Sequence, residues 1–144
     1  MLFRSVLFDR RRVLYWRDAG QLLDFTTKDD TAAYTAAVAL DDEAPRFLQI
    51  AGDSVSARDL ATTMTELTRR RFRLTWVGPV ALLALVARIG RAVSRDETSP
   101  FPAWQGMQYL HSMASGVAKL GTLDNDRYGV RPWTSVRDVL AAAR

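Results

Sequence analysis

Short β-forming segments alternate with helical segments along most of this chain, and this alternation limits its possible folds more than any other feature. The β-forming segments are rich in branched and aromatic residues, and they cover residues 3–8, 13–16, 22–26, 46–51 and 72–77. A basic turn at residues 9–12 separates the first two segments, which predicts a hairpin. Strands that alternate with helices usually become parallel neighbours joined by crossover helices. We therefore predict an α/β fold with at least one parallel strand pair.

Three helix starts carry polar residues at the spacing of an N-terminal cap. Thr27 and Asp30 have the Thr-x-x-Asp spacing, Ser56 precedes an apolar-periodic segment, and Ser135 and Asp138 repeat the capping-box pattern. Two further helices are expected after Gly78-Pro79 and from Pro102, where a proline in the first turn loses no helical hydrogen bond. The sequence thus predicts five helices.

The helical segments differ in the apolar face that each would bury. The predicted buried residues are Ala33, Ala37 and Leu40 in a helix running to about Leu40, Leu60, Met64 and Leu67 in the next, Ala103, Met107, Leu110 and Ala114 after Pro102, and Val136, Val139, Leu140 and Ala143 at the end. The helix over residues 79–93 is apolar on most of its surface, so we expect it to be substantially buried. The strand at 46–51 would have an unpaired edge unless another strand covers it.

Composition places this chain among globular proteins. Its 144 residues and 48% hydrophobic content suit one compact domain over residues 1–144. Cysteine is absent, and the longest apolar run, 76–87, is shorter than the roughly 20 residues that span a bilayer, so we expect a soluble, cytoplasmic protein without membrane association. The net charge of +4 comes almost entirely from arginine. The arginine triplets at 10–12 and 69–71 are interpreted first as codon bias and as compensation of a helix end, not as phosphate recognition.

The sequence contains no complete catalytic, metal-binding or nucleotide-binding pattern. Its eight glycines are scattered, without the Gly-x-Gly spacing that lets a backbone approach a pyrophosphate. No tyrosine is followed by lysine at the fourth position, and the single histidine, His111, excludes a multi-histidine metal site. The paired carboxylates Asp29 and Asp30 are interpreted as helix-capping groups, and Asp124-Asn125-Asp126 as a turn in preference to a cation site.

One aromatic segment is the best candidate for a small-molecule pocket. Phe101, Trp104, Met107 and Tyr109, with His111 nearby, combine large apolar side chains with a few polar tips. The alternative, which the spacing favours, is a helix that packs into the core, because these positions wrap around more than one helix face. We predict no catalytic, cofactor-binding or metal-binding residues in this chain.

Seven segments in order resemble the carboxy-terminal part of NmrA-like proteins, which are similar to isoflavone reductases and other atypical short-chain dehydrogenase/reductases. They are YW at 15–16, LDFTTKDDTA at 23–32, RFLQIAG at 46–52, SARDL at 56–60, AWQGMQY at 103–109, LDNDRY at 123–128 and WTSVRD at 133–138. The resemblance implies a partial Rossmann-like fold with a helical substrate-side subdomain, whose amino-terminal NAD(P)-binding half is absent from these residues. Arg17 departs from the family pattern, which often has glycine after Tyr-Trp.

Two functions are compatible with this resemblance. The leading hypothesis is a truncated or split substrate-side module of an NAD(P)-dependent oxidoreductase that is inactive alone, binds no cofactor alone and needs a Rossmann-half partner chain. The alternative is a noncatalytic regulatory or self-associating module, similar to the family's redox sensors, which would use an uncovered sheet edge or the helix at 79–93. Nucleic-acid binding through the two arginine triplets is the weakest of the hypotheses. The resemblance does not indicate the substrate.

Overall fold

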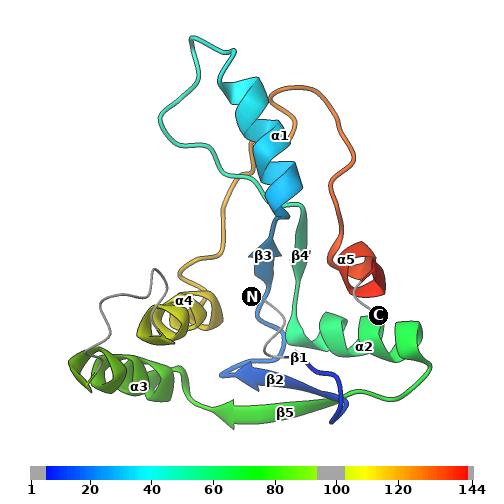
Figure 1. Ribbon diagram of the computed structural model, residues 1–144, viewed down its shortest axis with the longest axis vertical. Helices are drawn as coiled ribbons and strands as arrows, with labels where there is room; N and C mark the ends of the chain where they lie inside the picture. The colour runs from blue at the N-terminus through cyan, green and yellow to red at the C-terminus, as the bar shows by residue number, and fades with distance from the viewer. Residues whose placement is uncertain (1–5, 94–102, 143–144) are drawn as a thin grey trace. The chain divides into compact units, whose positions relative to one another are not determined.

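A computed structural model describes residues 6–93 and 103–142 of this chain, which divides into two compact units. Unit 1 comprises Met1–Leu23 and Ser56–Ala118, and unit 2 comprises Asp24–Val55 and Lys119–Arg144. The expected α/β class is confirmed, since helices and short mixed strands follow one another along the chain (Figure 1). The expectation of one domain over residues 1–144 stays a prediction.

Unit 1 contains a three-stranded sheet in the order β1-β2-β5, formed by β1 (Val6–Leu7), β2 (Arg12–Trp16) and β5 (Arg73–Gly78). β1 and β2 pair in antiparallel fashion, so the predicted hairpin is confirmed. β2 and β5 run parallel, which confirms the predicted parallel pair. Val13 in the central strand has no exposed surface, and this strand supplies part of the core of unit 1.

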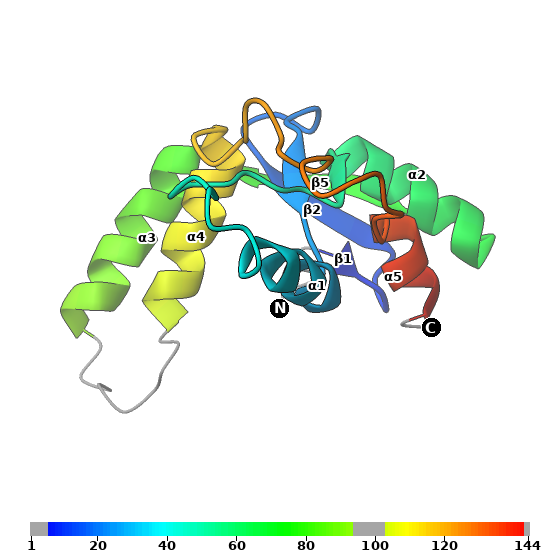
Figure 2. The ribbon, with the colours of Figure 1, turned by 90° about the horizontal axis from the view of Figure 1, so that it is seen from above.

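Three helices belong to unit 1, namely α2 (Ala57–Thr68), α3 (Val80–Val93) and α4 (Ala103–Ser115). α2 packs against β2 and β5 and buries Leu60 and Met64, as the sequence predicts. Its start is fixed by a capping box in which the Asp59 N–H donates to Ser56 Oγ and the Ser56 N–H donates to the Asp59 carboxylate. Figure 2 shows α3 and α4 lying side by side.

The prediction that the apolar helix α3 is substantially buried is wrong for the described residues. Leu83 is buried, but Leu82, Leu85, Val86 and Ile89 are 39–55% exposed. α4 packs against α3, but these four apolar side chains of α3 remain exposed. A large apolar surface of this kind usually marks an interaction site.

Unit 2 is built from β3 (Leu23–Phe25), β4 (Asp53–Val55), α1 (Lys28–Val38) and α5 (Val136–Ala142), with β3 paired to β4. Thr27 caps α1 by accepting from the Asp30 N–H at 3.0 Å, and Ser135 accepts from the Asp138 N–H at 3.1 Å. Both sequence-predicted caps are therefore confirmed. Val136 and Leu140 of α5 are buried as expected, while Ala143 lies outside the described residues.

The strand predicted at 46–51 is wrong, because the strand of this region is β4, beginning at Asp53. Residues 49–51 belong to no strand, and their backbone groups bind side chains and the Asp124 N–H, which donates to the Gln49 carbonyl at 2.7 Å. The Asn125 amide donates to the Ala51 carbonyl at 2.7 Å and accepts from the Ala51 N–H at 3.1 Å. The Gln49 N–H donates to the Asp124 carboxylate at 2.8 Å. Polar side chains thus satisfy backbone groups that a strand partner would otherwise bind.

The buried face of α1 also differs from the predicted one. Ala33 and Leu40 are exposed, Leu40 by 88%, whereas Asp30 and Tyr34 are buried. Tyr34 is held by a hydrogen bond from its hydroxyl to the Asp124 carbonyl at 2.7 Å. Hydrogen bonding of polar side chains, and not apolar periodicity, decides which side of this helix faces inward.

None of the helices in the described ranges is both long enough and apolar enough to cross a lipid bilayer.

Candidate functional site

The predicted pocket residues lie on α4, except Phe101, which is outside the described residues. Trp104, Met107 and His111 share one face of the helix and are partly buried, while Tyr109 points to the other side and is 57% exposed. Gly90 of α3 approaches the Trp104 side: a Cβ atom at Gly90 would lie 3.4 Å from the Trp104 Cβ. One part of the predicted set therefore lies against α3, and Tyr109 is separated from it.

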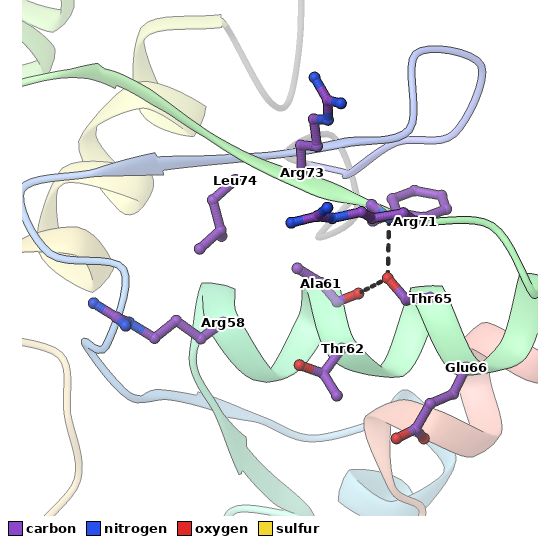
Figure 3. Close-up of a pocket in the computed structure, with 9 residues that line it drawn as sticks. Arg58, Ala61, Thr62, Thr65, Glu66, Arg71, Arg73 and Leu74 are labelled. Carbon is purple, nitrogen blue, oxygen red and sulfur yellow. Dashed lines mark hydrogen bonds between the residues drawn. The ribbon is translucent and has the colours of Figure 1, made fainter.

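A different part of unit 1 forms an open groove of about 600 Å³ between α2 and the start of β5 (Figure 3). Its lining residues come from these two elements and the turn that joins them, and they are Arg58, Ala61, Thr62, Thr65, Glu66, Arg71, Phe72, Arg73 and Leu74. None of the predicted pocket residues is among them. The arginine triplet at 69–71 is visible in the sequence, and one of its members, Arg71, lines the groove. Only the packing of α2 on β5 brings Arg58 to the same groove.

The groove has an apolar floor and a polar rim. Ala61 and Phe72 are buried, and Thr65 is held by two hydrogen bonds, donating to the Ala61 carbonyl at 2.7 Å and accepting from the Phe72 N–H at 3.0 Å. In Figure 3 the Arg58 side chain extends from the start of α2 and points away from Arg71, which comes from the segment before β5. Arg58, Arg71 and Glu66 give the groove a rim of mixed charge.

The sheet of unit 1 ends at β5, which within the described residues pairs only with β2. Leu74, Trp76 and Val77 of this strand are 39%, 58% and 39% exposed. An edge strand with exposed apolar side chains can accept a further strand from another chain or domain. We call the exposed apolar residues of β5 and α3 the β5–α3 surface, comprising Leu74, Trp76, Val77, Leu82, Leu85, Val86 and Ile89.

Two carboxylates of unit 2, Asp30, which the sequence singles out, and Asp24, have structural partners. Burial raises the pKa of Asp30, but hydrogen bonds from Thr27 and Thr134 outweigh it and hold the pKa below its ordinary value. Asp24 behaves in the same way. Burial raises its pKa, but hydrogen bonds from Lys119 and the Leu120 N–H outweigh this effect and hold the pKa below its ordinary value. Both groups are thus ionised anchors and are poorly suited to accept or donate protons near neutral pH.

Within residues 6–93 and 103–142, no three histidine, cysteine, aspartate or glutamate side chains lie close enough together to hold a metal ion. The segment 124–126 forms the expected turn, in which the Arg127 N–H donates to the Asp124 carbonyl and the Gly129 N–H to the Asp126 carbonyl.

The described helix starts of α1 and α2 do not suit a dinucleotide pyrophosphate. A pyrophosphate binds where free N–H groups of a helix start meet a glycine-rich turn. Here side chains of Thr27 and Ser56 already bind these N–H groups, and the first turns carry acidic residues, Asp29 and Asp30 in α1 and Asp59 in α2. An anion at either position would displace the caps and face carboxylates.

Comparison with known proteins adds a likeness of fold. Neither protein-family models nor curated proteins give a match to this chain. Among solved structures, a nucleoside-diphosphate-sugar epimerase from Staphylococcus aureus is similar, with a TM-score of 0.64 and 20% sequence identity. The similarity covers 94% of this chain but only 45% of the epimerase chain. This chain therefore has an α/β fold similar to part of that epimerase and spans less than half of its length.

Proposed function

We propose that these residues form the substrate-side part of an NmrA-like NAD(P)-dependent oxidoreductase, which works with a dinucleotide-binding half on the same longer chain or on a partner chain. The likeness of nearly all of this chain to under half of a larger enzyme carries the proposal. The ordered resemblance of seven segments to NmrA-like proteins supports the narrower family assignment. We expect this function in the cytoplasm.

The helix starts of the described chain support the need for a second half. Because α1 and α2 are capped by their own side chains and carry acidic first turns, these two helix starts do not fit the pyrophosphate of NAD(P). In our proposal, NAD(P) is held by glycine-rich backbone of the dinucleotide-binding half. Alone, these residues should have no oxidoreductase activity.

The β5–α3 surface is our assignment for the contact with the missing half. The free edge of β5 offers backbone hydrogen-bonding groups, and Trp76 contributes a large exposed apolar side chain beside them. Completing a sheet satisfies the backbone groups and removes apolar surface from water at the same time.

The substrate pocket remains assigned to Phe101, Trp104, Met107, Tyr109 and His111. The exposed ring of Tyr109 supports this assignment, since its hydroxyl is available to a ligand, whereas the packing of Trp104 toward α3 favours a structural role for that residue. The chemical identity of the substrate does not follow from these side chains.

Nucleotide titration tests the proposal. The purified chain should show no NADPH or NADH binding in the micromolar range by calorimetry, and a fusion to a dinucleotide-binding half carrying a glycine-rich turn should bind the cofactor and oxidise it with a suitable substrate. The Trp76→Asp variant should weaken association with a separately supplied half, while Val130→Asp, which changes a residue 92% exposed in unit 2, should not. Micromolar NADPH binding by this chain alone would contradict the proposal.

A noncatalytic, self-associating module is the second candidate, and the exposed apolar residues of α3 favour it. Light scattering separates the two proposals. A stable homodimer that becomes monomeric on Leu85→Asp substitution and has no nucleotide affinity, even after fusion to a dinucleotide-binding half, would favour self-association.

A further inference from the structure

The fold brings the two arginine triplets of the sequence to the same end of the sheet in unit 1. Arg12 of β2 lies opposite Arg73 of β5 in the parallel register, and the Arg73 N–H donates to the Arg11 carbonyl at 3.0 Å. Arg71 precedes β5 directly and lines the groove with Arg58. We call the exposed arginines at this end of the sheet the arginine surface, and they are Arg10, Arg11, Arg12, Arg69, Arg70, Arg71 and Arg73.

Within the described parts of the chain, the seven guanidinium groups of this surface form no ion pair with a carboxylate. The ion pairs there belong to unit 2, where Lys119 pairs with Asp24 at 2.9 Å, Arg127 with Asp41 at 3.0 Å and Arg131 with Asp30 at 3.8 Å. The cations of these three pairs have carboxylate partners within the protein. The arginines of the arginine surface have no such partner among the described residues, so they can bind an external anion.

Compensation of a helix end explains only a small part of this surface. α2 has no basic residue in its last turn, and Arg69 is its C-cap residue, in the left-handed conformation with a φ of 56°. The helix dipole acts within about one turn of the helix end, so it gives no reason for the basic hairpin turn or for Arg73 within a strand.

The position of the arginine surface separates it from the site proposed above. β2 and β5 both begin at this end of the sheet, with Arg12 and Arg73 as their first residues. Ligands of open α/β sheets bind at the opposite, carboxyl end of the parallel strands. A ligand of the arginine surface is therefore a second ligand, independent of any substrate or dinucleotide.

We propose that the arginine surface binds the phosphate backbone of duplex nucleic acid. Guanidinium groups pair with phosphate oxygens through two hydrogen bonds at once, and seven of them spread over two segments match a row of phosphates better than one small anion. Single strands need aromatic side chains on which bases stack. The groove's one aromatic residue, Phe72, is only 7% exposed, so recognition through the backbone of a duplex is favoured.

Fluorescence anisotropy with a labelled 20-base-pair DNA duplex tests this proposal. If about six arginines contact phosphates, affinity should fall roughly 10³-fold between 50 and 200 mM salt. The Arg71→Ala/Arg73→Ala variant should bind at least about tenfold more weakly at 50 mM salt and should reduce the salt slope by about 2. Both side chains are exposed at the rim of the groove, so the unfolding midpoint should be unchanged.

The matched control is Arg46→Ala/Arg88→Ala, which removes the same charge from exposed arginines outside the surface. This control should bind the duplex within about twofold of the parent chain. An equal loss of affinity in both double variants would overturn the proposal, since net charge alone would then explain binding. So would failure to bind the duplex at 50 mM salt.

Two competitors identify the source of the phosphate groups. Free tripolyphosphate and vesicles containing phosphatidylserine should displace the labelled duplex only weakly. Displacement should need a concentration of phosphate groups or lipid headgroups far above the concentration of phosphate groups in the duplex. Binding of either as tightly as the duplex, per phosphate group, would overturn the assignment to nucleic acid. These results do not depend on NAD(P), so the proposed function can fail or hold separately.

Discussion

Replacing Asn125 by alanine should destabilise unit 2, because this side chain takes the place of a strand partner for Ala51. The amide makes two hydrogen bonds, 2.7 Å to the Ala51 carbonyl and 3.1 Å from the Ala51 N–H. Ala51 is only 4% exposed, so water has little access to the groups that the substitution leaves unpaired. An unpaired buried polar group costs about 1–3 kcal/mol. For two such groups, with some relaxation, we expect a loss of about 2–4 kcal/mol in the free energy of unfolding.

Urea denaturation followed by circular dichroism measures this loss. With a slope of about 2 kcal/mol per molar urea, the transition that involves unit 2 should shift by about 1–2 M. The matched control is Asp126→Ala, since Asp126 is an exposed neighbour whose side chain has no hydrogen-bond partner among the described residues, and it should change stability by less than about 0.5 kcal/mol. An Asn125→Ala variant as stable as this control would refute the reasoning that a side chain replaces the strand pairing.

Three other substitutions test the packing and electrostatics of the chain. Gly52→Ala places a Cβ atom 3.1 Å from the Thr134 carbonyl oxygen, so it should lower the melting temperature and cost about 1–3 kcal/mol, and an unchanged melting temperature would contradict this tight approach. Gly106→Ala meets no atom within 4 Å in an exposed part of α4, so it should raise stability by about 0.5–1 kcal/mol in the same thermal scan; a loss would indicate a hidden contact. Asp30 has a folded-state pKa below the ordinary 3.8, so its contribution to stability is complete well above pH 3.8 and disappears as the pH falls toward the folded value. Asp30→Asn should therefore flatten the loss of stability in acid, measured as urea midpoints between about pH 5 and pH 2, and an unaltered acid profile would show that another group controls it.

The helix starts were predictable from sequence because capping is local. Thr27, Ser56 and Ser135 each bind a backbone N–H only three residues further along, so the spacing of two residues contains the whole interaction. The hairpin of β1 and β2 follows from a short turn for the same reason. The α/β class could also be predicted, since alternating periodicity reports which segments can form strands and helices.

The candidate sites depended on contacts between residues far apart in the chain. The strand predicted at 46–51 fails because Asn125 and Asp124 satisfy its backbone, and no periodicity near Ala51 records that. Of the predicted pocket residues on α4, Tyr109 is exposed and Trp104 lies toward α3. The packing of α4 against α3 decides this difference.

The sequence by itself determined where the capped helices begin, that the chain is of the α/β class, and that no glycine-rich turn is present to hold a pyrophosphate. Each of these properties depends on neighbouring residues, whose geometry is set by the backbone within one or two turns. Only the tertiary structure decided that Arg12 faces Arg73 and that Arg58 and Arg71 share a groove. Strand register and helix packing are set by burial across the whole unit, so a charged surface assembled from distant segments emerges only when the chain is folded.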